Sequence, residues 1–93
     1  MSDAGALVLE GPVNIHTVPG LVESIPSHLA AGVRTIDFTR VTEVDSAAVA
    51  LALEWRRSAA AGNFQITLSN VPETLRNLAN LYGVADLLAS SGA

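Results

Sequence analysis

Residues 36–55, Ile-Asp-Phe-Thr-Arg-Val-Thr-Glu-Val-Asp-Ser-Ala-Ala-Val-Ala-Leu-Ala-Leu-Glu-Trp, contain the pattern that decides the fold. An extended apolar run ends at Phe38, and the polar segment 39–43 predicts a short loop. Asp45 and Ser46 then stand directly before seven apolar residues. Both residue types favour the start of a helix, because a side-chain oxygen can accept a hydrogen bond from a free backbone N–H of the first turn. We therefore expect a strand, a loop and a helix in succession.

The first two turns of this predicted helix are apolar on every side, with Val49 and Leu51 pointing in different directions. A surface helix usually carries one apolar stripe and one polar face. Either both faces are buried within the domain, or one of them packs against a partner protein. Because the chain is short, we consider packing against a partner a serious alternative. It predicts an exposed apolar surface around Ala47, Ala50, Leu51 and Glu54.

Outward from this stretch, strands alternate with helices. Apolar runs and a clean alternation predict strands at 6–9, 33–38 and 64–69, with helices at 17–31, 46–61 and 73–82 and a final turn at 84–88. Pro26 lies inside the first helical pattern and predicts a kink or a late helix start. The third helix has a predicted buried stripe of Leu75, Leu78, Ala79 and Tyr82. This order predicts an α/β fold with a mostly parallel sheet, and the half-polar third strand indicates a sheet edge or an open face.

The composition limits the classes of function. A chain of 93 residues forms one domain, here residues 1–93. The net charge is −4 and lysine is absent, so the chain lacks the basic surface that binds nucleic acid or anionic lipid. Cysteine is also absent, and the N-terminal sequence lacks the features of a signal peptide. The longest apolar run is far shorter than the ~20 residues that span a bilayer. We therefore expect a soluble, cytoplasmic protein.

No catalytic or metal site is predicted. Ser46 beside Asp45 would need a base to act as a nucleophile, and His16 and His28 each stand alone in the sequence. A helix-capping role for Ser46 is the simpler interpretation. Three acidic residues near the start of the central helix could hold a metal ion: Asp37, Glu43 and Asp45. We interpret them instead as helix caps and solvent-exposed loop residues. The sequence predicts a protein that is not an enzyme and that binds no cofactor.

Segment 37–51, Asp-Phe-Thr-Arg-Val-Thr-Glu-Val-Asp-Ser-Ala-Ala-Val-Ala-Leu, resembles the signature of STAS domains. Segment 71–84, Val-Pro-Glu-Thr-Leu-Arg-Asn-Leu-Ala-Asn-Leu-Tyr-Gly-Val, is similar to the C-terminal part of MlaB-type STAS proteins. The resemblance covers nearly the whole chain. It implies a small mixed, mostly parallel sheet with helices mainly on one face. In this family a hydroxyl residue at the head of the central helix, preceded by an acid, contacts the partner, and these positions correspond to Ser46 and Asp45.

The MlaB-type resemblance also implies a function. It predicts a non-enzymatic cytoplasmic subunit that binds the ATPase subunit of a phospholipid-transport ABC complex, and supports a transporter that maintains the lipid asymmetry of the outer membrane. Such a subunit would be peripheral to the inner membrane through its complex. Two departures stand out: Ala48 occupies a position where many STAS domains have glycine, and one strand is expected before the first helix where many relatives have a hairpin.

A second branch of the family supplies the alternative. In anti-sigma factor antagonists the residue equivalent to Ser46 is phosphorylated by a partner kinase, which switches partner binding. A free-standing small-molecule binding domain is a third possibility. The partner-binding residues expected under the first interpretation are Asp45, Ser46, Ala47, Ala50, Leu51 and Glu54.

Overall fold

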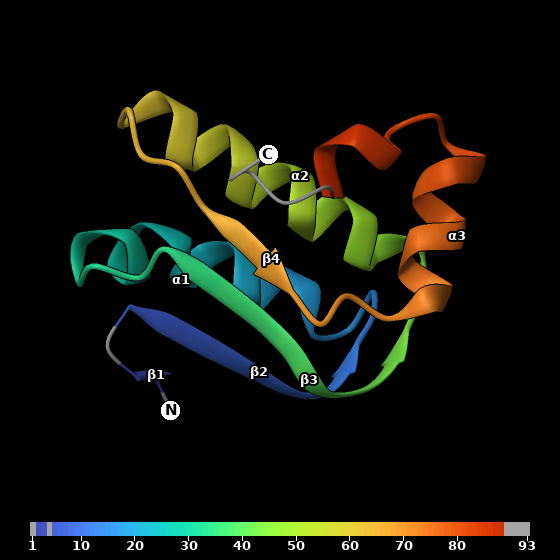
Figure 1. The fold of residues 1–93 in the computed structure, drawn as a ribbon. Coiled ribbons are helices and arrows are strands. Elements are labelled where there is room, and N and C mark those ends of the chain that lie inside the picture. The colour runs from blue at the N-terminus through green and yellow to red at the C-terminus, as the bar shows by residue number, and fades with distance from the viewer. Residues whose placement is uncertain (1, 4, 89–93) are drawn as a thin grey trace.

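In the computed structural model, which describes residues 2–3 and 5–88, strands and helices alternate as the sequence predicts (Figure 1). The elements are β1 (Ser2–Asp3), β2 (Ala6–Val13), α1 (Val18–Ala30), β3 (Thr35–Val44), α2 (Ser46–Ala61), β4 (Thr67–Ser69), α3 (Glu73–Leu81) and the 3₁₀ helix η1 (Ala85–Leu88). The sheet order is β1-β2-β3-β4. β2, β3 and β4 are parallel, and β1 is antiparallel to β2. The predicted α/β fold with a mixed, mostly parallel sheet is confirmed.

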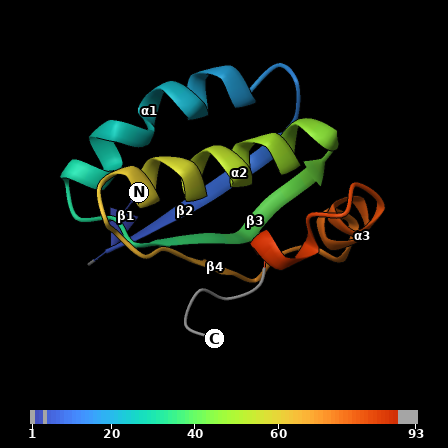
Figure 2. The ribbon, with the colours of Figure 1, turned by 90° about the horizontal axis from the view of Figure 1, so that it is seen from above.

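The helices lie mainly on one face of the sheet, also as predicted. Figure 2 shows α1 and α2 side by side over this face, with α3 beyond the sheet and near the start of α2. Buried side chains from the strands and from both covering helices form one apolar core, with Trp55 at 1% exposure among its largest members. Trp55 is therefore a core residue and not a contact for a partner.

Helix α1 begins where the sequence predicts. Thr17 occupies the position before the helix, and Pro19 lies in its first turn, where a missing backbone N–H is tolerated. Of the kink or late start expected from Pro26, the late start is wrong, because the helix runs from Val18 through Pro26 as one element. Gly32 has a φ of +98°, a left-handed conformation that glycine adopts without strain and that ends the helix.

Strands β2 and β3 are both longer than predicted. Segment 39–43, expected as a loop, continues β3 and pairs with the second half of β2, which runs through the Gly11-Pro12 pair instead of stopping there. The register shifts twice along this pairing, and Gly11 has a φ of +78°. These irregularities allow a glycine, a proline and several polar residues to remain in the strands, so the boundaries predicted from local sequence are wrong.

Two further boundaries differ from expectation. Ser2 and Asp3 form β1, so the chain does have a short hairpin before α1. Strand β4 contains only Thr67–Ser69, and Phe64 lies outside it with 38% of its surface exposed. The guanidinium carbon of Arg34 lies 3.8 Å from the centre of the Phe64 ring. Phe64 was expected in the strand; instead it lies before β4, and its ring makes a cation–π contact with Arg34.

Helix α3 buries Leu75 and Ala79 as predicted, while Tyr82 is 55% exposed and its expected burial is wrong. Tyr82 follows the last helical residue, and Gly83 turns the chain with a φ of +73°. The backbone N–H of Val84 then donates to the carbonyl of Ala79 at 2.8 Å, and Val84 packs against the core. The turn directs Val84 inward and leaves Tyr82 in solvent.

Asp37, interpreted above as a cap or loop residue, lies on β3 between the buried residues Ile36 and Phe38 and therefore on the sheet face opposite the helices. Its Oδ1 accepts hydrogen bonds from the backbone N–H and the hydroxyl of Thr39 and from Nδ2 of Asn70, the last at 3.0 Å. These donors lower the pKa of Asp37 below its ordinary value, the Thr39 hydroxyl most of all. Asp37 therefore joins β3 to the segment that leads into α3.

Candidate functional site: the head of helix α2

The candidate site is the first two turns of α2, residues 46–53, together with the neighbouring β2–α1 loop; we call this the α2 head. Figures 1 and 2 both place this loop beside the start of α2, at the end of the molecule where β2 and β3 terminate. The backbone N–H of Asp45 donates to the carbonyl of Val13 at 3.4 Å, which ties the two strand ends together. The sheet thus fixes the position from which α2 starts.

Asp45 caps the helix and holds the loop at the same time. It has extended backbone angles, and its Oδ1 accepts a hydrogen bond from the backbone N–H of Ala47 at 2.8 Å. Its Oδ2 accepts from the backbone N–H of Ile15 at 3.3 Å. Both carboxylate oxygens therefore have partners within the chain. Asp45 was predicted as a partner contact, and the geometry gives it an internal role in shaping the surface.

Ser46 is the first residue of α2 and is exposed. Its hydroxyl makes no hydrogen bond within the part of the chain that the structure describes, since the cap is supplied by Asp45. The interpretation of Ser46 as the helix cap is therefore wrong. An exposed hydroxyl at a helix start, with no structural duty among the described residues, is available to a partner or to a modifying enzyme.

Helical periodicity separates the predicted surface residues. A turn of about 3.6 residues places Ser46, Ala50 and Leu53 on one line along the outside of α2. Ala50 is exposed and Leu53 is half-buried. Ala47 and Glu54 are partly exposed at the side of this line, as expected.

The prediction that Leu51 is exposed is wrong, because its exposure is 0%. Leu51 lies about 140° around the helix from Ser46, at about 100° per residue, on the side that meets the core. Ala48 is also fully buried. Its methyl group therefore faces the core and not the surface that a partner would meet. The apolar run thus divides between an inner face that packs and an outer face that stays in solvent.

Ile15 is a surface residue that the sequence did not reveal. Its side chain is 62% exposed on the β2–α1 loop, although it is a large apolar residue. The loop itself is ordered by local hydrogen bonds, in which the Oδ1 of Asn14 accepts from the backbone N–H of His16 at 2.9 Å. The only available signal was an isoleucine between polar residues, a pattern that also fits a short strand.

The described residues do not include a cluster that could hold a metal ion. No group of three or more His, Cys, Asp or Glu side chains among them could hold a metal ion. His28 stacks on Trp55, with ring centres 6.1 Å apart, and is thereby placed away from the Ser46 hydroxyl. No described helix is long and apolar enough to cross a bilayer.

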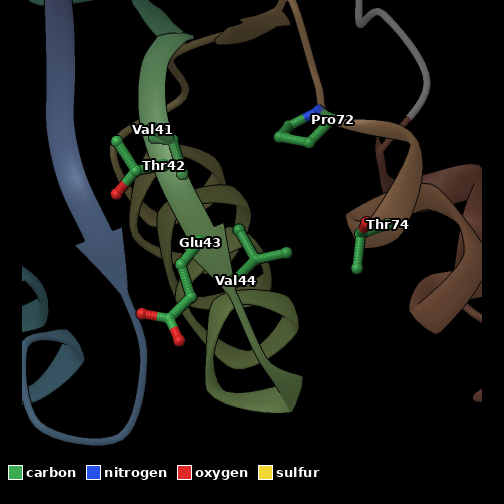
Figure 3. A pocket seen from close by; sticks show the side chains of 6 residues that line it. All are labelled: Val41, Thr42, Glu43, Val44, Pro72 and Thr74. Atoms are coloured by element: carbon green, nitrogen blue, oxygen red, sulfur yellow. The ribbon is translucent and has the colours of Figure 1, made fainter.

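A groove lies between the end of β3 and the start of α3, close to the α2 head. It is lined by Val41, Thr42, Glu43, Val44, Pro72 and Thr74. Figure 3 shows Val44 facing Pro72 and Thr74 across it, with the carboxylate of Glu43 turned away from them. This lining offers no cluster of charged or nucleophilic groups, so the groove does not suggest an active site.

The fold and the α2 head define a STAS-domain protein. A family model described as MlaB, STAS domain, matches residues 1–89, and the chain therefore belongs to this family. No curated protein sequence gives a significant match.

Two solved structures show the same fold. The anti-sigma factor antagonist SpoIIAA in its unphosphorylated form is 26% identical, with a TM-score of 0.68 over 94% of this chain and 80% of that one. The Bacillus cell fate determinant SpoIIAA in its phosphorylated form is also 26% identical, with a TM-score of 0.65 over 94% of this chain and 83% of that one.

Proposed function

We propose that the chain is a non-enzymatic STAS subunit that binds the ATPase subunit of a phospholipid-transport ABC complex through the α2 head. It would lie on the cytoplasmic side, peripheral to the inner membrane, and support the assembly and activity of a transporter that maintains outer-membrane lipid asymmetry. The MlaB description of the matching family model favours this partner. The observation that carries the proposal is the exposed hydroxyl of Ser46, which makes no hydrogen bond among the described residues and lies on the same side of α2 as the uncharged Ala50 and Leu53.

The chemistry of the α2 head suits contact with another protein. Ser46, Ala50 and Leu53 present a hydroxyl, a methyl group and a leucine side chain, none of which carries a charge. The nearest charged residues on this face of α2 pair with each other, with an Arg57 nitrogen 2.9 Å from an oxygen of Glu54. Interface centres are depleted in charge and can be desolvated at low cost, while charged residues remain at the rim. The small side chains at positions 46, 47 and 50 would also allow a partner to approach the helix closely.

The test is binding of the purified chain to the ATPase subunit of the transporter from the same organism. Ala50→Arg should weaken binding by a factor of 100 or more, because an unpaired charge would be pressed into an apolar contact at a cost of several kcal/mol. Ala60→Arg is the matched control: Ala60 is also exposed on α2, about 15 Å along the helix from Ala50 at 1.5 Å per residue. Equal binding by both variants would exclude the α2 head from the interface.

The alternative is an anti-sigma factor antagonist that is switched by phosphorylation of Ser46. Its support is the similarity to SpoIIAA, an anti-sigma factor antagonist that was solved in both phosphorylated and unphosphorylated forms. The exposed hydroxyl of Ser46 could accept a phosphoryl group from ATP in the active site of a partner kinase. Purification of tagged chain from its own cells separates the two functions, since one predicts that an ABC ATPase copurifies and the other predicts an anti-sigma factor kinase.

A further inference from the structure

We infer that Ile15 is an apolar anchor of the same docking surface, and that Asp45 is the positioning residue that holds it there. The inference rests on the proposed function and extends the surface from one helix to a second segment, 30 positions away in the sequence. The occupant is the docking protein, which would cover Ile15 with an uncharged, apolar patch. It names an interface residue that the family resemblance does not supply.

Ile15 is a large apolar residue that is exposed to solvent. Ile15 has 62% of its surface in solvent. The other exposed residue of the loop between β2 and α1, His16, is polar. A single exposed apolar residue is ordinary on a protein surface. Ile15 differs in its position, because its backbone N–H donates to the carboxylate of Asp45, the residue directly before Ser46, and the loop that carries Ile15 therefore lies against the start of α2.

A hydrogen bond holds the β2–α1 loop against the start of α2. The loop is joined to the α2 head by the hydrogen bond from the Ile15 backbone N–H to Oδ2 of Asp45, at 3.3 Å. The same carboxylate caps α2 through Oδ1, at 2.8 Å from the Ala47 nitrogen. One side chain therefore fixes both the start of the helix and the place of Ile15 relative to it. A surface organised in advance of docking loses less conformational freedom on binding.

The charges around the surface indicate what kind of occupant it accepts. The chain carries a net charge of −4, yet the side chains of Ile15, Ser46, Ala50 and Leu53 carry no formal charge. The charged neighbour between Ile15 and Ser46 is Asp45, and both of its carboxylate oxygens already accept hydrogen bonds from backbone N–H groups of the chain. A basic peptide or an anionic membrane would find no complementary charge on the four uncharged side chains. An apolar protein surface fits them, with Glu54 and Arg57 at their border.

The experiment measures affinity for the purified ATPase subunit with four variants of the full chain. Ile15→Ser should bind at least tenfold more weakly, since truncation of a central apolar anchor commonly has an effect of this size or more. Leu81→Ser is the matched control, because Leu81 is an exposed leucine, 77% accessible, at the end of α3, and it should bind like the parent. Thermal unfolding of each variant would show that the fold is retained.

Asp45→Asn separates positioning from folding. An asparagine oxygen can still cap Ala47, whereas its amide nitrogen cannot accept a hydrogen bond from Ile15. Asp45→Asn should therefore melt close to the parent and bind more weakly. If Asp45 acts through Ile15, the double variant Ile15→Ser/Asp45→Asn should bind no more weakly than Ile15→Ser alone.

The outcomes distinguish this inference from the proposed function. Full-strength binding by Ile15→Ser, with binding lost in Ala50→Arg, would overturn the inference and leave the function standing. Additive losses in the double variant would contradict the role of Asp45 as a residue that acts through Ile15. Full-strength binding by Ala50→Arg would overturn the function itself and the inference with it.

Discussion

Leu51 and Leu53 lie two positions apart on α2, yet Leu51 is fully buried and Leu53 is half-exposed on the outer line of the helix. Leu51→Ala should lower the free energy of unfolding by about 2–5 kcal/mol, because the deletion leaves a cavity in a packed core. Leu53→Ala should cost clearly less, because part of its surface already meets solvent. Chemical denaturation of both variants checks this; equal losses would show that the assignment of the two faces is wrong.

Ser46→Ala should leave stability nearly unchanged, within about 0.5 kcal/mol, because the hydroxyl makes no hydrogen bond in the described structure. Alanine is also a good helix former at this first position. Thermal unfolding compared with the parent tests the expectation. A loss of about 1 kcal/mol or more, the usual cost of a lost cap, would indicate that Ser46 helps to cap α2 after all.

Asp45→Ala should be the costly substitution at the head of α2. It removes the cap on Ala47 and the tether to Ile15 together. Loss of a helix cap costs about 0.5–2 kcal/mol, and Asp45→Asn should recover most of that amount. If alanine and asparagine melted at the same temperature as the parent, the carboxylate would have no structural role.

Asp37 should contribute to stability in a pH-dependent way. Its folded pKa lies below the ordinary value of 3.8, because the ionised form accepts hydrogen bonds from Thr39 and Asn70. Its contribution is therefore fully present above the unfolded pKa and is lost as the pH falls through the lower, folded pKa. The stability of the parent should fall more steeply than that of Asp37→Asn below about pH 4. Parallel curves for both proteins would contradict the role of these hydrogen bonds.

Much of the fold could be predicted from local sequence. The start of α2 at Ser46 depends on nearby residues and was predicted correctly, and Asp45, one of the two residues expected to favour the helix start, supplies the cap. The extents of β2 and β3 could not be predicted, because segment 39–43 forms a strand only through its pairing with residues 10–13. The length of a strand depends on the neighbouring strands with which it pairs, and these are distant in the sequence. The polarity of the local residues does not identify them.

The candidate site shows the same limit. The outward positions of Ser46 and Ala50 follow from helical periodicity once the inner face is known. The sequence could not show which side of an entirely apolar helix faces inward, so Leu51 was assigned to the wrong face. Ile15 was missed because its proximity to the α2 head depends on a hydrogen bond to Asp45, which periodicity cannot predict.

Coverage of the α2 head by a partner ATPase is the central claim, and chemical labelling of that surface measures it directly. The chain contains no cysteine, so Ala50→Cys and Ala60→Cys each introduce one unique thiol at an exposed position of α2. The measurement is the rate of maleimide labelling, with and without saturating ATPase subunit, in complexes whose formation is verified separately. We predict that the partner slows labelling of the Ala50→Cys variant at least tenfold and leaves labelling of the Ala60→Cys variant unaffected. Equal labelling rates for the Ala50→Cys variant, free and in the complex, would contradict the claim.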